Sequence, residues 1–249
     1  VLVLFRHAVG PFRQGHAPLL PIAGWDALTP MINGWMGVDL FFVLSGFLIT
    51  HHVCRRYGGA LDRRTAGDYL MRRALRIVPA YYAVLFLVAA GLVPHYTVAP
   101  DDLGRRVLAH MLFMQDYLPP DILVVFWSLG VEEKFYLLAP LLLAGVLCAR
   151  RPLVQYVLVA AVACLPTLFR WQVAESAPGA LDYPMYFRLY RSAFHLSFDG
   201  LALGMLCALL HRDRERWPWL RDGRGAATIF WVGAAIVGWL LAARPLYDR

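Results

Sequence analysis

One histidine near the start of the chain has the chemistry of a general base. His7 lies in the apolar segment from Val1 to Val9. An alcohol loses its proton as it attacks a thioester, and a neutral imidazole with a pKa of about 6.5 is suited to accept that proton. A lone histidine is more often structural, so His7 becomes a catalytic candidate only together with other reactive groups. His16 is a weaker candidate, because it follows Pro11 in a polar segment.

Two aspartates occur within apolar stretches. Asp39 lies in GVDLFFVLSGFLIT at 37–50, and Asp199 lies in FDGLALG at 198–204. A carboxylate inside a membrane is costly unless it is paired or lies near a helix end, so both are site candidates. We expect Asp199 to pair with Arg191 or with a basic residue of another helix.

The same two apolar stretches also contain small residues. Ser45 and Gly46 lie in the first stretch, and Gly200 and Gly204 lie in the second. Small residues let helices approach closely, and a serine hydroxyl can bond to a carbonyl one turn earlier. Close helix packing is therefore the simplest interpretation of these four residues.

A basic cluster leads directly into a predicted span. The segment RRALRIVPAYY at 72–82 contains Arg72, Arg73 and Arg76, with Pro79 near the expected start of the span, where proline is tolerated. Guanidinium groups at the cytoplasmic face bind phosphates, and a phosphate-bearing acyl donor would need such a patch. The alternative is that these arginines only anchor the chain beside anionic lipid.

An acid pair begins the next apolar stretch. Glu132 and Glu133 lie in FWSLGVEEKFYLL at 126–138. Neighbouring helical residues point about 100° apart, so we expect only one of the two to face a given site. The other would pair with Lys134 or an arginine, or face solvent at the helix end. Glu132 lies one turn before Tyr136, and the two are expected to form a polar patch.

The composition excludes an ordinary soluble domain. Hydrophobic residues make up 59% of the chain and charged residues 16%, with a mean hydropathy of +0.53, whereas soluble domains are about a quarter charged. The net charge of +7 comes from arginine clusters between apolar runs, which is typical of cytoplasmic loops and not of a nucleic-acid groove. Neither the four cysteines nor the adjacent His51 and His52 have the spacing of a metal site.

Apolar segment lengths and arginine clusters predict an all-α, multi-pass membrane bundle. The stretches long enough to cross a core of about 30 Å are 35–54, 78–97, 124–148, 153–169, 192–210 and 226–243. The shorter segment 107–118 is expected to be interfacial, re-entrant or packed in the bundle. Arginines at 55–76 and 211–224 favour a cytoplasmic location, which leaves 98–123 and 170–190 outside. If 107–118 crosses, one arginine cluster would instead lie outside.

Four of these segments, in this order, resemble the acyltransferase family 3 membrane proteins, which include O-antigen and other surface-polysaccharide acetylases. They are the segments at 37–50, 69–82, 126–138 and 198–204. The resemblance implies one membrane domain over 1–249, with about seven to eight whole or partial helices of an expected ten or so. The family has an arginine ten residues before the histidine that His7 matches. That arginine would precede Val1, so we expect a domain truncated at both ends.

The resemblance also implies a reaction and roles for residues. The reaction is transfer of an acyl group, usually acetyl from acetyl-CoA, to a hydroxyl of a carbohydrate or glycolipid acceptor at the cell membrane, with no tightly bound cofactor and no metal. His7 would be the general base, with Glu132 as the acid of a catalytic motif and Arg72, Arg73 and Arg76 meeting the donor. The supporting positions would be Asp39, Ser45, Trp127 and Asp199.

Two alternatives stay open. In the first, an acyl-histidine relay would replace direct attack of the hydroxyl on the thioester. In the second, the chain would be a transporter or flippase whose charged intramembrane residues line a substrate or proton path, although no inverted repeat is visible. The predicted outer segments contain no recognisable sugar, lipid or antibiotic motif, so the acceptor is not predicted.

Overall fold

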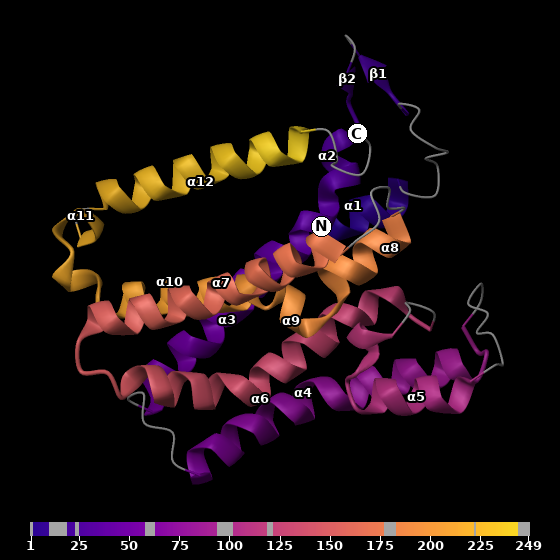
Figure 1. The fold of residues 1–249 in the computed structure, drawn as a ribbon, viewed down its shortest axis with the longest axis horizontal. Coiled ribbons are helices and arrows are strands. Elements are labelled where there is room, and N and C mark those ends of the chain that lie inside the picture. The colour runs from indigo at the N-terminus through magenta and orange to yellow at the C-terminus, as the bar shows by residue number, and fades with distance from the viewer. Residues whose placement is uncertain are drawn as a thin grey trace. The chain divides into compact units, whose positions relative to one another are not determined.

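The computed structural model describes residues 2–9, 19–22, 25–57, 63–93, 102–118, 122–176, 183–221 and 223–243. The described chain is helical apart from a short antiparallel hairpin of β1 (Pro21–Ile22) and β2 (Trp25–Asp26) (Figure 1). It divides into two compact units, the first comprising residues 1–41 and 210–249 and the second residues 42–209. The prediction of an all-α protein is confirmed.

Unit 1 joins the two ends of the chain. Asn33 donates hydrogen bonds from Nδ2 to the carbonyls of Leu241 (2.9 Å) and Ala243 (2.8 Å), and Trp25 donates from Nε1 to the Ala242 carbonyl (3.1 Å). These bonds satisfy carbonyls that a helix end leaves without partners. Besides the hairpin, unit 1 contains α1 (Leu2–Val9), α2 (Thr29–Ile32), η2 (Asn33–Trp35), the start of α3 (Met36–Tyr57), η6 (Arg214–Arg216), α11 (Pro218–Arg221) and α12 (Arg224–Ala242).

Unit 2 contains the remainder of α3 and the central helices, and its helices α4 and α6 lie side by side in Figure 1. A buried cluster between them includes Tyr81, Leu85 and Phe126. Its other elements are α4 (Arg63–Ala89), α5 (Leu103–Met111), η3 (Gln115–Tyr117), η4 (Val124–Phe126), α6 (Trp127–Leu147), α7 (Pro152–Ser176), α8 (Tyr183–Phe187), the π-helical turn η5 (Arg188–Ser192), α9 (Phe194–Ser197) and most of α10 (Asp199–Arg212).

Helices α3 and α10 cross in direct backbone contact. A Cβ atom added to Gly46 would lie 2.0 Å from the carbonyl oxygen of Leu201, and one added to Gly204 would lie 2.1 Å from that of Val43. Since carbon and oxygen do not approach so closely without a bond, both positions require glycine at this spacing. The packing role predicted for Gly46 and Gly204 is therefore confirmed.

Three described helices are long and apolar enough to cross a membrane. They span Thr29–Arg56, Pro152–Ser176 and Arg224–Ala242. The first two contain the predicted spans at 35–54 and 153–169, and the third covers the predicted span at 226–243 except for its last residue. Helices α4 and α6 are also long, at 27 and 21 residues, but they carry the arginine cluster and the acid pair. The total of seven to eight spanning helices stays a prediction.

Two details of the predicted spans are wrong. The stretch 192–210 is not one helix, because Ala193 is extended (φ −74°, ψ 143°) and α10 begins only at Asp199. Its 14 residues rise about 21 Å, less than the hydrocarbon thickness. Pro79 lies in the interior of α4 rather than near its start, because the helix continues back through the basic cluster to Arg63.

The short segment 107–118 packs inside unit 2. Helix α5 has nine residues and rises about 14 Å, which is too short to cross. Tyr81 and Tyr82 of α4 donate hydroxyl hydrogen bonds to the carbonyls of His110 (3.0 Å) and Met111 (2.7 Å). This packing corresponds to one of the expected alternatives.

Candidate functional site

An arginine of α4 and the aromatic residues around it form a charged site within unit 2. The guanidinium of Arg73 lies over the rings of Tyr136 on α6 (5.0 Å to the centroid) and Tyr69 on α4 (5.9 Å). Both tyrosines are almost completely buried, with 5% and 3% of their surface exposed. The aromatic faces attract the cation, and burial strengthens this attraction because water does not screen it.

Both glutamates of α6 belong to this site. Glu132 is buried (3% exposed) and interacts with Tyr136 one turn later, as predicted, while Glu133 interacts electrostatically with Arg73. The negative charges of both carboxylates also act on the Tyr69 hydroxyl. The expectation that only one of the two glutamates faces the site stays a prediction, because the two carboxylates are linked to Tyr69 and Arg73 by electrostatics and not by a direct contact.

The hydrogen bonding of this site is incomplete. Among the described residues, the Tyr69 hydroxyl and Oε1 of Glu133 are buried without a hydrogen-bond partner. Most buried polar atoms in proteins have partners, so each exception calls for an explanation, and a catalytic or binding role is one of them. We call this group, formed by Tyr69, Arg73, Glu132, Glu133 and Tyr136, the Arg73 cluster.

The Arg73 cluster lies deep along α6 rather than at a helix end. Tyr136 is close to the middle of α6, and Arg73 contacts it there. Arg73 interacts electrostatically with Glu133 of the same cluster, and charged groups gathered on predicted membrane helices are functional-site candidates. The structure thus separates the predicted donor-binding residues: Arg73 points into unit 2, whereas Arg72 and Arg76 are exposed.

A second charged group occupies another side of α6. Nζ of Lys134 lies 2.6 Å from Oδ1 of Asp116, which is completely buried, and also donates to the carbonyls of Phe113 and Gly130. Oδ2 of Asp116 accepts the backbone N–H of Phe194 (2.9 Å). Burial raises the pKa of the Asp116 carboxyl, and the hydrogen bond from Lys134 opposes this shift. Of the alternatives considered for the glutamates, pairing with Lys134 is therefore wrong.

Sequence reasoning missed the role of Asp116. The available signal was its position, next to Gln115 in a short apolar segment. Gln115 donates from Nε2 to the Phe126 carbonyl (2.8 Å), so this segment supports the start of α6. A Cβ on Gly130 would lie 3.1 Å from both side chains, which explains the small residue at that position.

Trp127 and Ser45 have packing positions in unit 2. The Trp127 ring makes edge contacts with Phe42 (5.9 Å between centroids) and Phe187 (5.2 Å), and the guanidinium of Arg191 lies 6.0 Å from it. Ser45 is buried on α3 beside Gly46. The supporting role of both residues in the reaction stays a prediction.

Asp39 and Asp199 both lie in the first turn of a helix, where the helix dipole favours a negative charge. Asp199 pairs with Arg170 of α7, with Nη2 2.6 Å from Oδ2. The expected partner on another helix is thus confirmed, and the alternative partner Arg191 is wrong. Asp39 is half-buried near the start of α3 in unit 1.

The predicted site residues are divided between the two units. His7 is exposed on α1 and belongs to unit 1, together with Asp39. The Arg73 cluster, Ser45, Trp127 and Asp199 belong to unit 2. His16 lies outside the described residues. The catalytic and donor-binding roles of all these residues stay predictions.

No group of three or more His, Cys, Asp or Glu side chains within the described ranges has an arrangement that would hold a metal ion.

The whole chain is similar to one protein family. The sequence profile of a family described as an acyltransferase domain matches residues 1–248. The chain is 27% identical over 201 residues to the putative peptidoglycan O-acetyltransferase YrhL of Bacillus subtilis, covering 75% of this chain and 31% of that protein. It is 26% identical over 188 residues to the peptidoglycan O-acetyltransferase OatA of Listeria monocytogenes, covering 70% and 30%.

A further relative is the O-acetyltransferase OatA of Staphylococcus aureus, which is 30% identical over 135 residues, covering 48% of this chain and 22% of that protein. The chain thus spans less than a third of the length of these curated relatives. No solved structure matches the chain significantly.

Proposed function

Because this chain belongs to the acyltransferase family whose domain matches residues 1–248, we propose that it is part of an O-acyltransferase that modifies a cell-surface glycan. The Arg73 cluster is the observation that carries this proposal, because it holds a cation and two carboxylates together at the depth of α6. The names of two relatives favour acetyl as the transferred group and peptidoglycan as the acceptor.

The proposed setting is a single multi-pass domain in the cell membrane. Three apolar helices support this location, and the arginines at 55–76 and 211–224 favour the cytoplasmic side. In this orientation α4 and α6 run between the compartment of a cytosolic donor and that of a glycan acceptor. A transporter remains the alternative, and it is distinguished by the absence of an acylated product when labelled acetyl-CoA is added to inverted vesicles.

The proposed donor is acetyl-CoA, taken from the cytosol. The exposed Arg72 and Arg76 lie one turn apart on the same side of α4, where their guanidinium groups are available to phosphates. Arg73 points instead toward Tyr136, and we assign it the positive charge needed near the reacting carbonyl. Glu132 and Glu133 offset the cost of burying that charge.

In the proposed reaction, the acceptor hydroxyl attacks the thioester carbonyl carbon while the His7 imidazole takes its proton. The new C–O bond forms a tetrahedral intermediate, which collapses as the C–S bond breaks and coenzyme A leaves as a thiolate. The imidazolium then returns its proton to that sulfur, so that atoms and charges balance. In the relay alternative, the acyl group would rest on the imidazole between two transfers.

Replacement of His7 tests this reaction. In a full-length parent protein, His7→Ala should lower glycan acetylation about 10²- to 10⁴-fold, because the hydroxyl then attacks without a base. The measurement is labelled acetate in isolated glycan at matched protein levels. His211→Ala, which removes an exposed histidine at the end of α10, is the control and should keep activity. Unchanged product with His7→Ala would remove His7 from the mechanism.

A further inference from the structure

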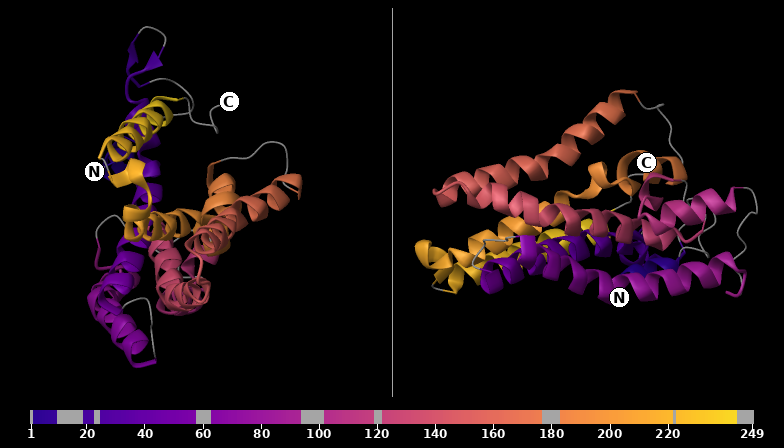
Figure 2. Two further views of the ribbon diagram at one scale, coloured as in Figure 1. Left: turned by 90° about the vertical axis from the view of Figure 1, so that its left-hand side faces the viewer. Right: turned by 90° about the horizontal axis from the view of Figure 1, so that it is seen from below.

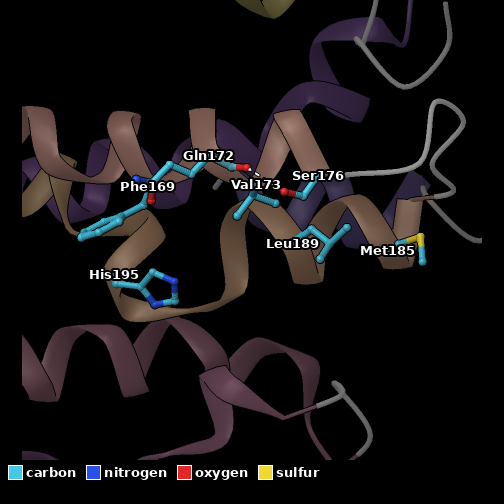
Figure 3. A pocket seen from close by; sticks show the side chains of 7 residues that line it. All are labelled: Phe169, Gln172, Val173, Ser176, Met185, Leu189 and His195. Carbon is cyan, nitrogen blue, oxygen red and sulfur yellow. Dashed lines mark hydrogen bonds between the residues drawn. The ribbon is translucent and has the colours of Figure 1, made fainter.

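A cavity lies between the C-terminal half of α7 and the segment formed by α8, η5 and α9 (Figure 3). Its volume is about 430 Å³, within the range of small-molecule sites, about 300–1,000 Å³. Phe169, Gln172 and Ser176 line it from α7, and His195 lines it from α9. The remaining lining is apolar, so a few polar groups stand in an otherwise hydrophobic wall. We call this space the α7–α9 cavity.

The imidazole of His195 is held in place from two sides. Its ring stacks on Tyr117, with 5.7 Å between centroids and 12° between planes, and its Nδ1 lies 3.4 Å from the Tyr117 hydroxyl. The Phe169 ring meets it edge-on at 5.6 Å. Contacts of this kind fix a ring orientation before a ligand arrives, and such preorganisation is typical of binding sites.

The backbone beside His195 is fixed as well. The N–H of Phe194 donates to Asp116, the carboxylate that pairs with Lys134 of α6. Lys134 follows Glu133 of the Arg73 cluster in sequence. Neighbouring residues of α6 thus serve two places in unit 2. Glu133 belongs to the Arg73 cluster, whereas Lys134 holds Asp116, which fixes the backbone beside the α7–α9 cavity.

The position along α7 indicates which side of the membrane the cavity faces. Helix α7 begins just after Arg150 and Arg151, which favour the cytoplasmic side, and the cavity is lined by its last two turns. Figure 2 shows that α7 diverges from α6 toward this end. In the proposed orientation the cavity is on the outer side, where a surface glycan is located.

We propose that the α7–α9 cavity binds a sugar ring of the acceptor, an inference that rests on the proposed function. A pyranose has C–H faces that pack on an aromatic ring, which Phe169 supplies, and a rim of hydroxyls that hydrogen-bond to polar side chains. Gln172, Ser176 and His195 supply such groups around the same space (Figure 3). In this role His195 binds the acceptor, and His7 remains the proposed base.

Acceptor kinetics test this assignment. The full-length parent is reconstituted in sugar-free nanodiscs, with acetyl-CoA as donor and chitotetraose as acceptor probe. His195→Gln and Phe169→Ala should each raise the KM for chitotetraose about three- to tenfold, the size expected for loss of one polar or ring contact. Both kcat and the KM for acetyl-CoA should stay within about twofold, because the donor site is untouched. Leu168→Ala, an exposed neighbour outside the cavity, is the matched control.

Direct binding separates this inference from the proposed function. Saturation-transfer NMR detects chitotetraose on the parent even if no acetyl transfer occurs. Loss of this signal in Phe169→Ala but not in Leu168→Ala would support the cavity, and absence of signal in the parent would overturn it. A changed KM for acetyl-CoA with an unchanged acceptor KM would also overturn it. Phe169→Leu, which keeps an apolar side chain, replaces the alanine variant if that variant fails to fold.

Discussion

At the scale of residues, the Lys134–Asp116 pair shows how burial increases the free-energy cost of breaking one ion pair. Asp116 is completely buried, so Lys134→Met would leave its charge without a cation. We expect the free energy of unfolding to fall by about 3–5 kcal/mol. The exposed Arg105–Asp102 pair is the matched control, and Asp102→Asn should cost less than about 1 kcal/mol. Chemical unfolding in mixed micelles measures the free energy of unfolding of both variants. Equal losses would contradict the conclusion that burial makes the Lys134–Asp116 pair the more important of the two.

The crossing of α3 and α10 illustrates the scale of elements. Gly204→Ala would place a methyl group against the Val43 carbonyl, and the helices would have to separate. We expect a loss of about 1–3 kcal/mol, seen as a lower unfolding temperature in detergent. Gly145→Ala on α6 is the control, since no atom lies within 4 Å of its added Cβ, and it should be neutral or slightly stabilising. If both substitutions behaved alike, close packing would not explain Gly204.

Membrane orientation belongs to the scale of the whole molecule. The arginine clusters predict that residue 214 lies on the cytoplasmic side and residue 105 on the outer side. In a background lacking Cys54, Cys148, Cys164 and Cys207, a membrane-impermeant maleimide should label Arg105→Cys in intact cells and leave Arg214→Cys unlabelled. Both side chains are at least half exposed, so both should react after permeabilisation. The reverse pattern in intact cells would overturn the orientation.

Composition and spacing predicted the helices that depend on local properties. The spans at 35–54, 153–169 and 226–243 were recognisable because long apolar stretches with few or no charges are rare outside membranes. The break at Ala193 was not recognisable, because 192–210 is apolar throughout most of its length and has no proline. Pro79 was misplaced for a related reason, since a proline marks either a helix start or an interior kink.

The sequence by itself determined the helical class, the family and the residue types at the candidate site. His7, Arg73 and Glu132 stand out because their chemistry and motifs are local properties. Only the tertiary structure decided the partners. It placed Lys134 against Asp116, paired Asp199 with Arg170, and turned Arg73 rather than Arg72 or Arg76 toward Tyr136 of α6. Helical periodicity defines the side on which a residue lies, whereas its partner depends on which distant helix packs there.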